Sequence, residues 1–202
     1  MRSPRTVILV EGTSDQLALE ALARRRGRDL DAEGVAVLAM GGAKNIGAFL
    51  QRYGPQGLDL ELAGMCDAAE EGDFRRGLER AGLGSGLSRV EMEQLGFSVC
   101  VEDLEDELIR ALGAGAVERV LGTLGDLAPF RTFQKQPEWQ GRPIEQQLRR
   151  FLAAGSGRKA RVAPLLVDAL DLHRVPRPLD RVLTHVSSDR LPRGPATPNR
   201  RE

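Results

Sequence analysis

The chain has 202 residues, of which 41% are hydrophobic and only 4% aromatic, which predicts one domain, or one with an appendage, around a core of Leu, Val and Ala. Its 29 basic and 29 acidic side chains cancel, and no apolar run approaches the ~20 residues that span a bilayer, which excludes a membrane-spanning protein. Two cysteines make no disulfide framework, and the first residues lack the apolar stretch of a signal peptide, so a cytoplasmic protein is expected.

Four short apolar runs, each followed by a helical pattern, predict the strands of a parallel sheet. In chain order the runs are Val7–Val10, Val35–Met40, Leu60–Cys66 and Phe97–Val101. Runs of this kind, bounded by turn residues, are typical of strands buried on both faces. After the first run, Thr13 and Gln16 fit a capping box at a helix start. Glu61 and Gly64 interrupt the third run.

From Gly113 onward the strand pattern stops and helical periodicity continues. Helices are predicted over residues 116–124, 143–154, 159–170 and 178–186, with a loop rich in Pro and Gln at 134–143. We therefore divide the chain into an α/β domain of residues 1–112, a helical extension of residues 113–186 and a disordered tail of residues 187–202.

Acidic side chains gather in one part of the chain. Residues 1–58 have a net charge of +2, residues 59–107 of −10 and residues 108–202 of +8. Solvated helix faces would explain this distribution. A cation-binding centre beside a surface that attracts polyanions would explain it equally well.

The positions of the acids favour the second explanation. Glu11, Asp67 and the cluster Glu102–Glu107 directly follow three of the predicted strands, and Asp15 lies one turn beyond Glu11. In a parallel sheet these strand ends share one edge, where converging carboxylates repel one another unless a hard divalent cation binds them. The helix macrodipole alone accounts for acids in a first turn, such as Asp106, but not for Glu11, which precedes its helix.

Several other residues have two interpretations. Gly41–Lys44 could bind a phosphate at a helix start, but it lacks the end of a Walker A loop, and an ordinary turn is favoured. Trp139 could stack on a base, although packing is favoured. Cys66 and Cys100 are expected to be buried apolar residues. Four arginines could follow a nucleic-acid backbone or form the polar faces of two helices: Arg149, Arg150, Arg158 and Arg161.

The run Leu-Val-Glu-Gly-Thr-Ser-Asp at residues 9–15, the Gly-Gly-Ala-Lys-Asn-Ile of residues 41–46 and the acid after the third strand together resemble the Toprim domain. Topoisomerases, bacterial primases, small maturation ribonucleases and OLD (overcoming lysogenization defect) nucleases share this domain, and the OLD type is the most similar. The resemblance covers residues 5–112 and extends loosely to residue 170. It implies a Rossmann-like core of about four parallel strands with flanking helices, followed by a small helical C-terminal region.

The resemblance also implies roles for particular residues. Glu11 would act in acid–base chemistry and bind metal, and Lys159, with Lys135 as the alternative, would be a second catalytic residue. A two-metal site for Mg²⁺ or Mn²⁺ would use Glu11, Asp15, Asp67, Asp103 and Glu105. Asp67 would bridge the two ions.

One position departs from the pattern of the family. The usual Asp-x-Asp after the third strand is Asp67-Ala68-Ala69 here, so Glu70, Glu71 or Asp73 must substitute, or one metal is held weakly. The ATPase domain that usually precedes the Toprim domain is expected to be absent, and a separate partner chain would have to supply ATP hydrolysis.

The leading hypothesis is therefore a metal-dependent phosphodiester hydrolase, an endonuclease or nickase, acting on nucleic acid by a one- or two-metal mechanism. DNA is favoured over RNA as the partner. A non-catalytic nucleic-acid-binding or assembly module and a nucleotidyl transferase of the primase type are the alternatives. A homodimer is left open.

Overall fold

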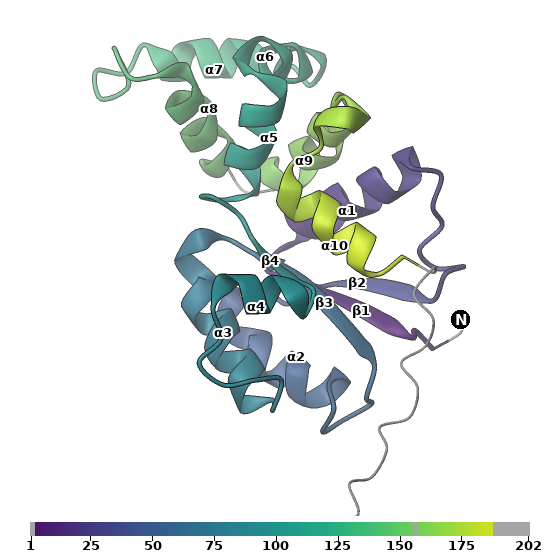
Figure 1. Cartoon of the computed structure of the whole chain (residues 1–202). Coiled ribbons are helices and arrows are strands. Elements are labelled where there is room, and N and C mark those ends of the chain that lie inside the picture. Colours follow the sequence, from purple (N-terminus) through teal and green to yellow (C-terminus); the bar gives the residue numbers. More distant parts are fainter. Residues whose placement is uncertain (1–2, 156, 188–202) are drawn as a thin grey trace, which may run out of the picture.

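A four-stranded parallel sheet forms the centre of the protein, for which a computed structural model describes residues 3–155 and 157–187. Its strands are β1 (Thr6–Val10), β2 (Val35–Ala39), β3 (Glu61–Cys66) and β4 (Phe97–Val99). They lie in the order β2-β1-β3-β4 (Figure 1). The predicted fold class is confirmed. The disorder predicted for the tail concerns residues that lie, apart from Ser187, outside the described part of the chain.

The fourth strand ends two residues earlier than predicted. Beyond Val99 the chain no longer continues the ladder, because the backbone N–H of Val101 donates to Glu107 Oε1 at 2.8 Å. Helix α5 (Leu104–Leu112), which carries Glu107, therefore begins close to the end of β4. This tight connection places Asp103 at the edge of the sheet.

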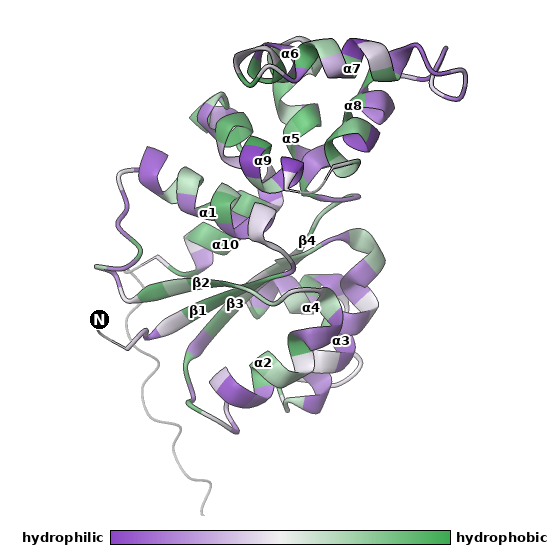
Figure 2. Cartoon of the chain, turned by 180° about the vertical axis from the view of Figure 1, so that it is seen from behind, coloured by the Kyte–Doolittle hydropathy of each residue, from purple (hydrophilic) through white to green (hydrophobic). Residues whose placement is uncertain are grey.

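Alternate residues of the fully buried strand β1 face two separate apolar clusters. Val7 and Leu9 belong to the cluster formed with α2 (Ile46–Tyr53), α3 (Glu71–Arg80) and α4 (Arg89–Gln94). Ile8 and Val10 belong to the cluster formed with α1 (Thr13–Arg25) and α10 (Arg177–His185). The molecule is therefore layered, with helices on both faces of the sheet. Figure 2 shows hydrophobic residues on the strands and polar residues on the outer turns of α2 and α3.

The remaining helices lie beyond α1 at one end of the molecule (Figure 1). They are α6 (Ala114–Thr123), α7 (Leu127–Gln134), α8 (Ile144–Ala153) and α9 (Arg158–Asp168). Three short 3-10 helices complete the described elements: η1 (Ala43–Asn45), η2 (Ala68–Glu70) and η3 (Leu172–Arg174). Helices α4 and α7, of six and eight residues, were not predicted because neither is long enough to show a clear periodicity.

Helix α9 packs along α1, and α10 returns to the sheet. Arginines at the end of α1 bond to carbonyl groups in and after the C-terminal helices. Arg25 Nη1 donates to Val167 O and Leu170 O, both at 2.7 Å. The division at residue 112 stays a prediction, and one apolar cluster runs across it. No helix in the described ranges is long and apolar enough to cross a membrane.

The predicted capping box at the start of α1 is wrong. The helix begins at Thr13, and the N-cap is Gly12, whose backbone is extended. Asp15, the third helical residue, accepts a hydrogen bond from Gly12 N at 2.9 Å. Gln16 instead bonds Glu20 one turn further along the helix. A carboxylate is therefore built into the first turn of the helix that follows β1.

Candidate metal centre

The candidate site lies where the connections of the sheet diverge. The chain leaves β1 through α1, which packs on one face, and leaves β3 through α3, which packs on the other. Since β1 and β3 are neighbours, the ends of these two strands flank a crevice of the kind in which open α/β sheets bind ligands. Glu11 and Asp67 are the first residues after these two strands.

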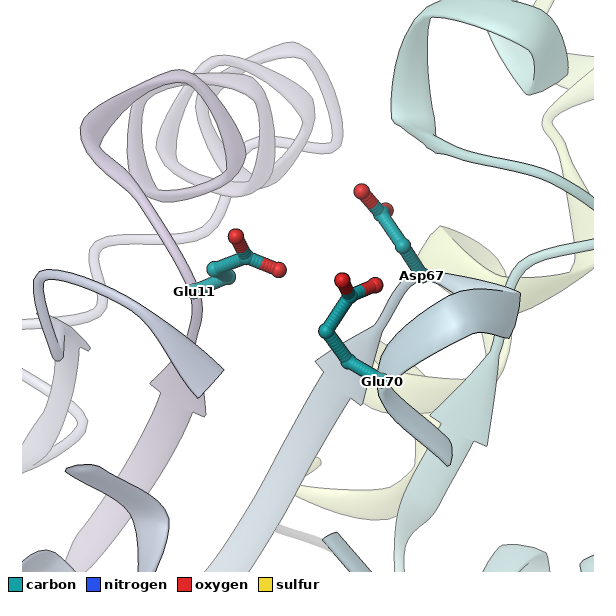
Figure 3. A group of neighbouring side chains, drawn as sticks. All are labelled: Glu11, Asp67 and Glu70. Atoms are coloured by element: carbon teal, nitrogen blue, oxygen red, sulfur yellow. The ribbon is translucent and has the colours of Figure 1, made fainter. Parts of the chain in front are cut away.

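Three carboxylates meet in this crevice. Glu11 and Asp67 lie beside Glu70, the last residue of η2, with ligand oxygens that all lie within 4.8 Å of one another. Figure 3 shows the three side chains turned toward one another. In the described part of the chain none of them forms an ion pair, and Glu11 Oε2 is buried without a hydrogen-bond partner. Their mutual repulsion is therefore not relieved by a neighbouring basic side chain in contact.

Glu70 supplies the third carboxylate of the cluster, since position 69, where an aspartate is usual, is an alanine here. Of the three acids that could substitute for the usual aspartate, Glu71 pairs with Arg89 at 2.5 Å, and Asp73 pairs with Arg76. Only Glu70 joins Glu11 and Asp67. The sequence offered all three acids, and the ion pairs of the other two decide among them.

Asp15 is buried close to Glu11 and Asp67. Only 9% of the residue is exposed, and its hydrogen bond to Gly12 fixes its carboxylate. Burial raises the pKa of Asp15 to about 6, against the opposing effect of the Gly12 hydrogen bond. Asp15 is thus close to the three-carboxylate cluster but is not one of its three members.

Asp103 and Glu105, the two predicted ligands at the start of α5, are paired with basic side chains instead. Asp103 caps α5 by accepting a hydrogen bond from Asp106 N at 2.8 Å and pairs with Arg149 Nε at 2.7 Å. Glu105, only 3% exposed, accepts a hydrogen bond from Lys159 Nζ at 2.6 Å. The second oxygen of Glu105, Oε1, is buried without a hydrogen-bond partner. The five predicted ligands therefore do not converge on one point in this conformation.

The electrostatics of the site reflect this crowding of acids. Burial raises the pKa of Asp67 to about 8, with further contributions from Asp15 and Glu11, and then from Asp103 and Glu105. Burial also raises the pKa of Glu11, and Glu70 raises it further, while Lys159 opposes the shift. A divalent cation would remove the cause of the electrostatic part of these shifts.

Lys159, at the start of α9, forms an ion pair with Glu105. Although burial disfavours its charged form, the Glu105 carboxylate outweighs burial, and the pKa of Lys159 is raised. Its side chain is 37% exposed, so the ammonium group is charged and reachable. Lys135, the alternative, is exposed at the end of α7.

Other singled-out residues have structural partners. The Trp139 ring stacks on Phe133 with 5.0 Å between centroids. Arg158 donates to Phe151 O at 2.8 Å, and Arg161 pairs with Asp126. Cys66 and Cys100 are buried, unbridged neighbours joined by a backbone hydrogen bond of 2.9 Å. Burial raises the pKa of both thiols, which makes them unreactive.

The donor set of the cluster fits a hard divalent cation. Carboxylate oxygens are the ligands that Mg²⁺ and Mn²⁺ prefer, and one oxygen of Glu11 is buried without a hydrogen-bond partner among the described residues. Among the predicted ligands, Asp15 and Asp103 accept backbone hydrogen bonds at helix starts, whereas Glu11 does not.

A family model matches the part of the chain that holds the first three strands and Asp67. Residues 4–68 match the family model described as the TOPRIM domain of proteins like the overcoming lysogenization defect protein. This match confirms the resemblance deduced from the sequence, over residues 4–68.

Two solved structures share the fold over nearly the whole chain. One is the C-terminal region of the Burkholderia pseudomallei OLD protein, with a TM-score of 0.69 and 19% identity over 91% of this chain and 97% of that one. The other is the C-terminal region of the Xanthomonas campestris pv. campestris OLD protein, phased with platinum. It has a TM-score of 0.70 and 24% identity, and the match covers 91% of this chain and 92% of that one. No curated protein sequence matches the chain.

Proposed function

We propose that the protein is a divalent-metal-dependent phosphodiester hydrolase that cuts or nicks nucleic acid. The observation that carries the proposal is the cluster of Glu11, Asp67 and Glu70, whose oxygens lie within 4.8 Å of one another without an ion-pair partner among the described residues. Such a cluster at the ends of central parallel strands is costly to maintain unless a ligand occupies it. The match of residues 4–68 to the OLD-like Toprim family model supports nuclease activity in general.

The first cation would be held by Glu11, Asp67 and Glu70, with Asp15 behind them. Bound there, Mg²⁺ or Mn²⁺ would polarise the phosphoryl oxygens and lower the pKa of water. A second ion would need Asp103 and Glu105, which now pair with Arg149 and Lys159. We therefore propose a site that is complete for one ion and becomes a two-metal site only if these ion pairs open.

Glu11 is the residue suited to accept the proton of the attacking water. Its raised pKa brings it closer to neutrality than an ordinary glutamate, and a base works best when its pKa lies near the operating pH. Its free oxygen has no hydrogen bond to break first.

Lys159 supplies positive charge beside the same crevice. Glu105 holds its ammonium group at 2.6 Å, and the exposed part of the side chain can turn toward phosphate oxygens. Fixed positive charge stabilises the negative charge that develops on those oxygens in the transition state.

A cleavage assay tests this function. Purified protein is incubated with supercoiled plasmid and with single-stranded DNA and RNA, in Mg²⁺, Mn²⁺ or EDTA. We expect nicking or cutting of DNA that requires the metal and falls by at least 100-fold in Glu11→Gln and Asp67→Asn, because each variant loses a ligand or the base. Lys159→Met is expected to lower the rate by ~10- to 100-fold.

Glu145→Gln is the matched control, because Glu145 is an exposed glutamate on α8, away from the crevice. It is expected to cleave at the wild-type rate. Cleavage that survives both Glu11→Gln and Asp67→Asn would show a contaminating nuclease or another site and would overturn the proposal.

A second function is favoured by the ion pairs of Asp103 and Glu105. If they stay closed, the protein is a metal-binding module that holds nucleic acid without cutting it. Calorimetry with Mn²⁺ separates the two functions: one bound ion without cleavage supports the module, and two ions with cleavage support the nuclease. A partner ATPase, a homodimer and a preference for DNA stay predictions.

A further inference from the structure

A second hollow on the surface is lined by arginines and has no part in the metal centre. It has a volume of about 490 Å³ and lies beside the edge strand β4, between α4, α5 and the start of α10. The arginines that line it are Arg89, Arg110, Arg174, Arg177 and Arg181. Only two acids, Glu93 and Glu107, also line it.

The positive charge is least compensated on the side formed by residues 174–181. Glu93 accepts hydrogen bonds from both Arg177 and Arg181, at 2.8 Å each, so one carboxylate serves two guanidinium groups. Arg174 has no ion-pair partner in the ranges that the structure describes. By contrast, Arg110 is paired with both Asp106 and Glu107, and Arg89 with Glu71. On this side one carboxylate therefore pairs with two of the three guanidinium groups and leaves Arg174 unpaired, an arrangement suited to an anion.

Apolar residues line the hollow beside these arginines. Val101 is 59% exposed, which is unusual for a large hydrophobic residue, and it lines the hollow together with Val175 and Pro176. An inorganic anion would leave these apolar side chains without a contact. A nucleotide unit, which joins a phosphate to an apolar base face and sugar, matches the arginines and the apolar residues of the lining at once.

The hollow adjoins the metal centre along the chain at two points. Val101 is followed directly by Glu102 and Asp103, and the latter lies near enough to Asp67 to raise its pKa. On the other side, Arg89 is bonded to Glu71, the neighbour of Glu70 in the cluster. A strand with one phosphate at the carboxylates could therefore extend into the arginines.

We propose that this arginine pocket, formed by Arg174, Arg177, Arg181, Val101 and Val175, binds a nucleotide unit of the substrate strand beside the phosphate held at the metal centre. The inference rests on the proposed function for the identity of the strand. Phosphate contacts of this kind position a nucleic acid without reading its sequence. Glu93 pairs with Arg177 and Arg181 in the absence of nucleic acid, and the phosphate replaces Glu93 as their partner when the strand binds.

Binding can be measured without cleavage in the Glu11→Gln background. The fluorescence anisotropy of a labelled single-stranded 12-nucleotide DNA reports affinity at 50 to 200 mM salt. We expect Arg174→Gln with Arg177→Gln to weaken binding by about tenfold and to reduce the salt slope by ~1.4, at ~0.7 for each lost phosphate contact. Glu93→Gln removes the competing carboxylate and is expected to tighten binding by about threefold.

Arg119→Gln is the matched control, since Arg119 is an exposed arginine of α6 that does not line the hollow. It is expected to bind like the background protein. Arg174 and Arg177 are exposed, so the double variant should fold, and circular dichroism verifies this. Unchanged affinity and salt slope in the folded double variant would overturn the proposal.

Competition by a mononucleotide distinguishes a strand from a free nucleotide. We expect deoxyadenosine monophosphate to compete only at concentrations at least 100-fold above those of the unlabelled 12-nucleotide strand, because it reaches one of the two adjoining sites. Equal competition would overturn the assignment to the substrate strand. Loss of binding in the double variant together with absent cleavage in the wild type would uphold the pocket and reject only the nuclease.

Discussion

At the residue scale, the charged carboxylate of Asp67 is unfavourable in the metal-free fold, and a bound cation would make it favourable. Its pKa in the folded protein is about 8, whereas an aspartate in the unfolded chain titrates near 3.9. Folding therefore favours the protonated form. This contribution to stability is fully present below about pH 4 and is lost as the pH rises through about 8.

Replacing Asp67 should consequently stabilise the metal-free protein at high pH. We expect the stability of Asp67→Asn relative to the wild type to grow from pH 5 to pH 9 and to reach ~1–3 kcal/mol, a range discounted for solvent screening. Thermal unfolding in EDTA across this pH range measures it.

Saturating Mn²⁺ should reverse the order, because only the wild type keeps the ligand and gains ~2.7 kcal/mol at 100 times its dissociation constant. Asp168→Asn, at an exposed position of α9, is the control for the loss of one carboxylate and should keep the stability of the wild type within ~0.5 kcal/mol. A difference between Asp67→Asn and wild type that stays constant with pH would contradict the assigned pKa.

At the scale of single elements, β3 shows why a glycine occupies a central strand. Gly64 appeared in the sequence as an interruption of the apolar run. A Cβ at this position would lie 2.7 Å from Leu9 O in β1 and 2.7 Å from the ring of Phe97 in β4. The glycine allows both neighbours to approach, and with them the strand ends that carry the acids.

Gly64→Ala is therefore expected to destabilise the protein by ~2–4 kcal/mol, because one of the clashes is with backbone that cannot move away. Chemical denaturation measures the change. Gly47→Ala is the matched control: Gly47 lies in α2 with nothing within 4 Å of its added Cβ. It should be neutral or stabilise by up to ~1 kcal/mol through helix propensity. Equal stability of the two variants would contradict the close packing around Gly64.

Helix α5 is the element that joins the site to the helical region. Its N-cap Asp103 binds Arg149 of α8, and its buried Glu105 binds Lys159 of α9. These partners are 46 and 54 residues away in the chain. The same two acids that could bind a second ion therefore also fix the position of α5.

At the scale of the whole molecule, α1 is packed between the sheet and the C-terminal helices. It shares one apolar cluster with α9 and α10, and the arginines at its end bond to their carbonyl groups. Arg28 donates to Leu183 O at 2.6 Å and to Val186 O at 3.2 Å. The predicted boundary at residue 112 separates two parts that share their core.

A fragment of residues 1–112 should consequently fail to fold by itself. It would leave exposed the face of α1 that packs on α9, together with the carbonyl-binding arginines. We expect broad, non-cooperative unfolding and binding of a hydrophobic dye, whereas the chain of residues 1–187 should unfold in one cooperative transition. A fragment with sharp unfolding would instead establish residues 1–112 as an independent domain.

The sequence by itself determined the parallel α/β fold and the strand ends occupied by Glu11 and Asp67. These features follow from local periodicity and from the rule that parallel strands end at a common edge. Short-range patterns suffice because each involves residues close together in the chain.

Only the tertiary structure decided which acids converge. Glu70 joins the cluster because Glu71 and Asp73 are bound to arginines. Asp103 and Glu105 are neutralised by partners from other helices, and the arginine pocket draws on three separated segments. Such contacts depend on how helices pack against one another, and the spacing of residues along the chain does not carry that information.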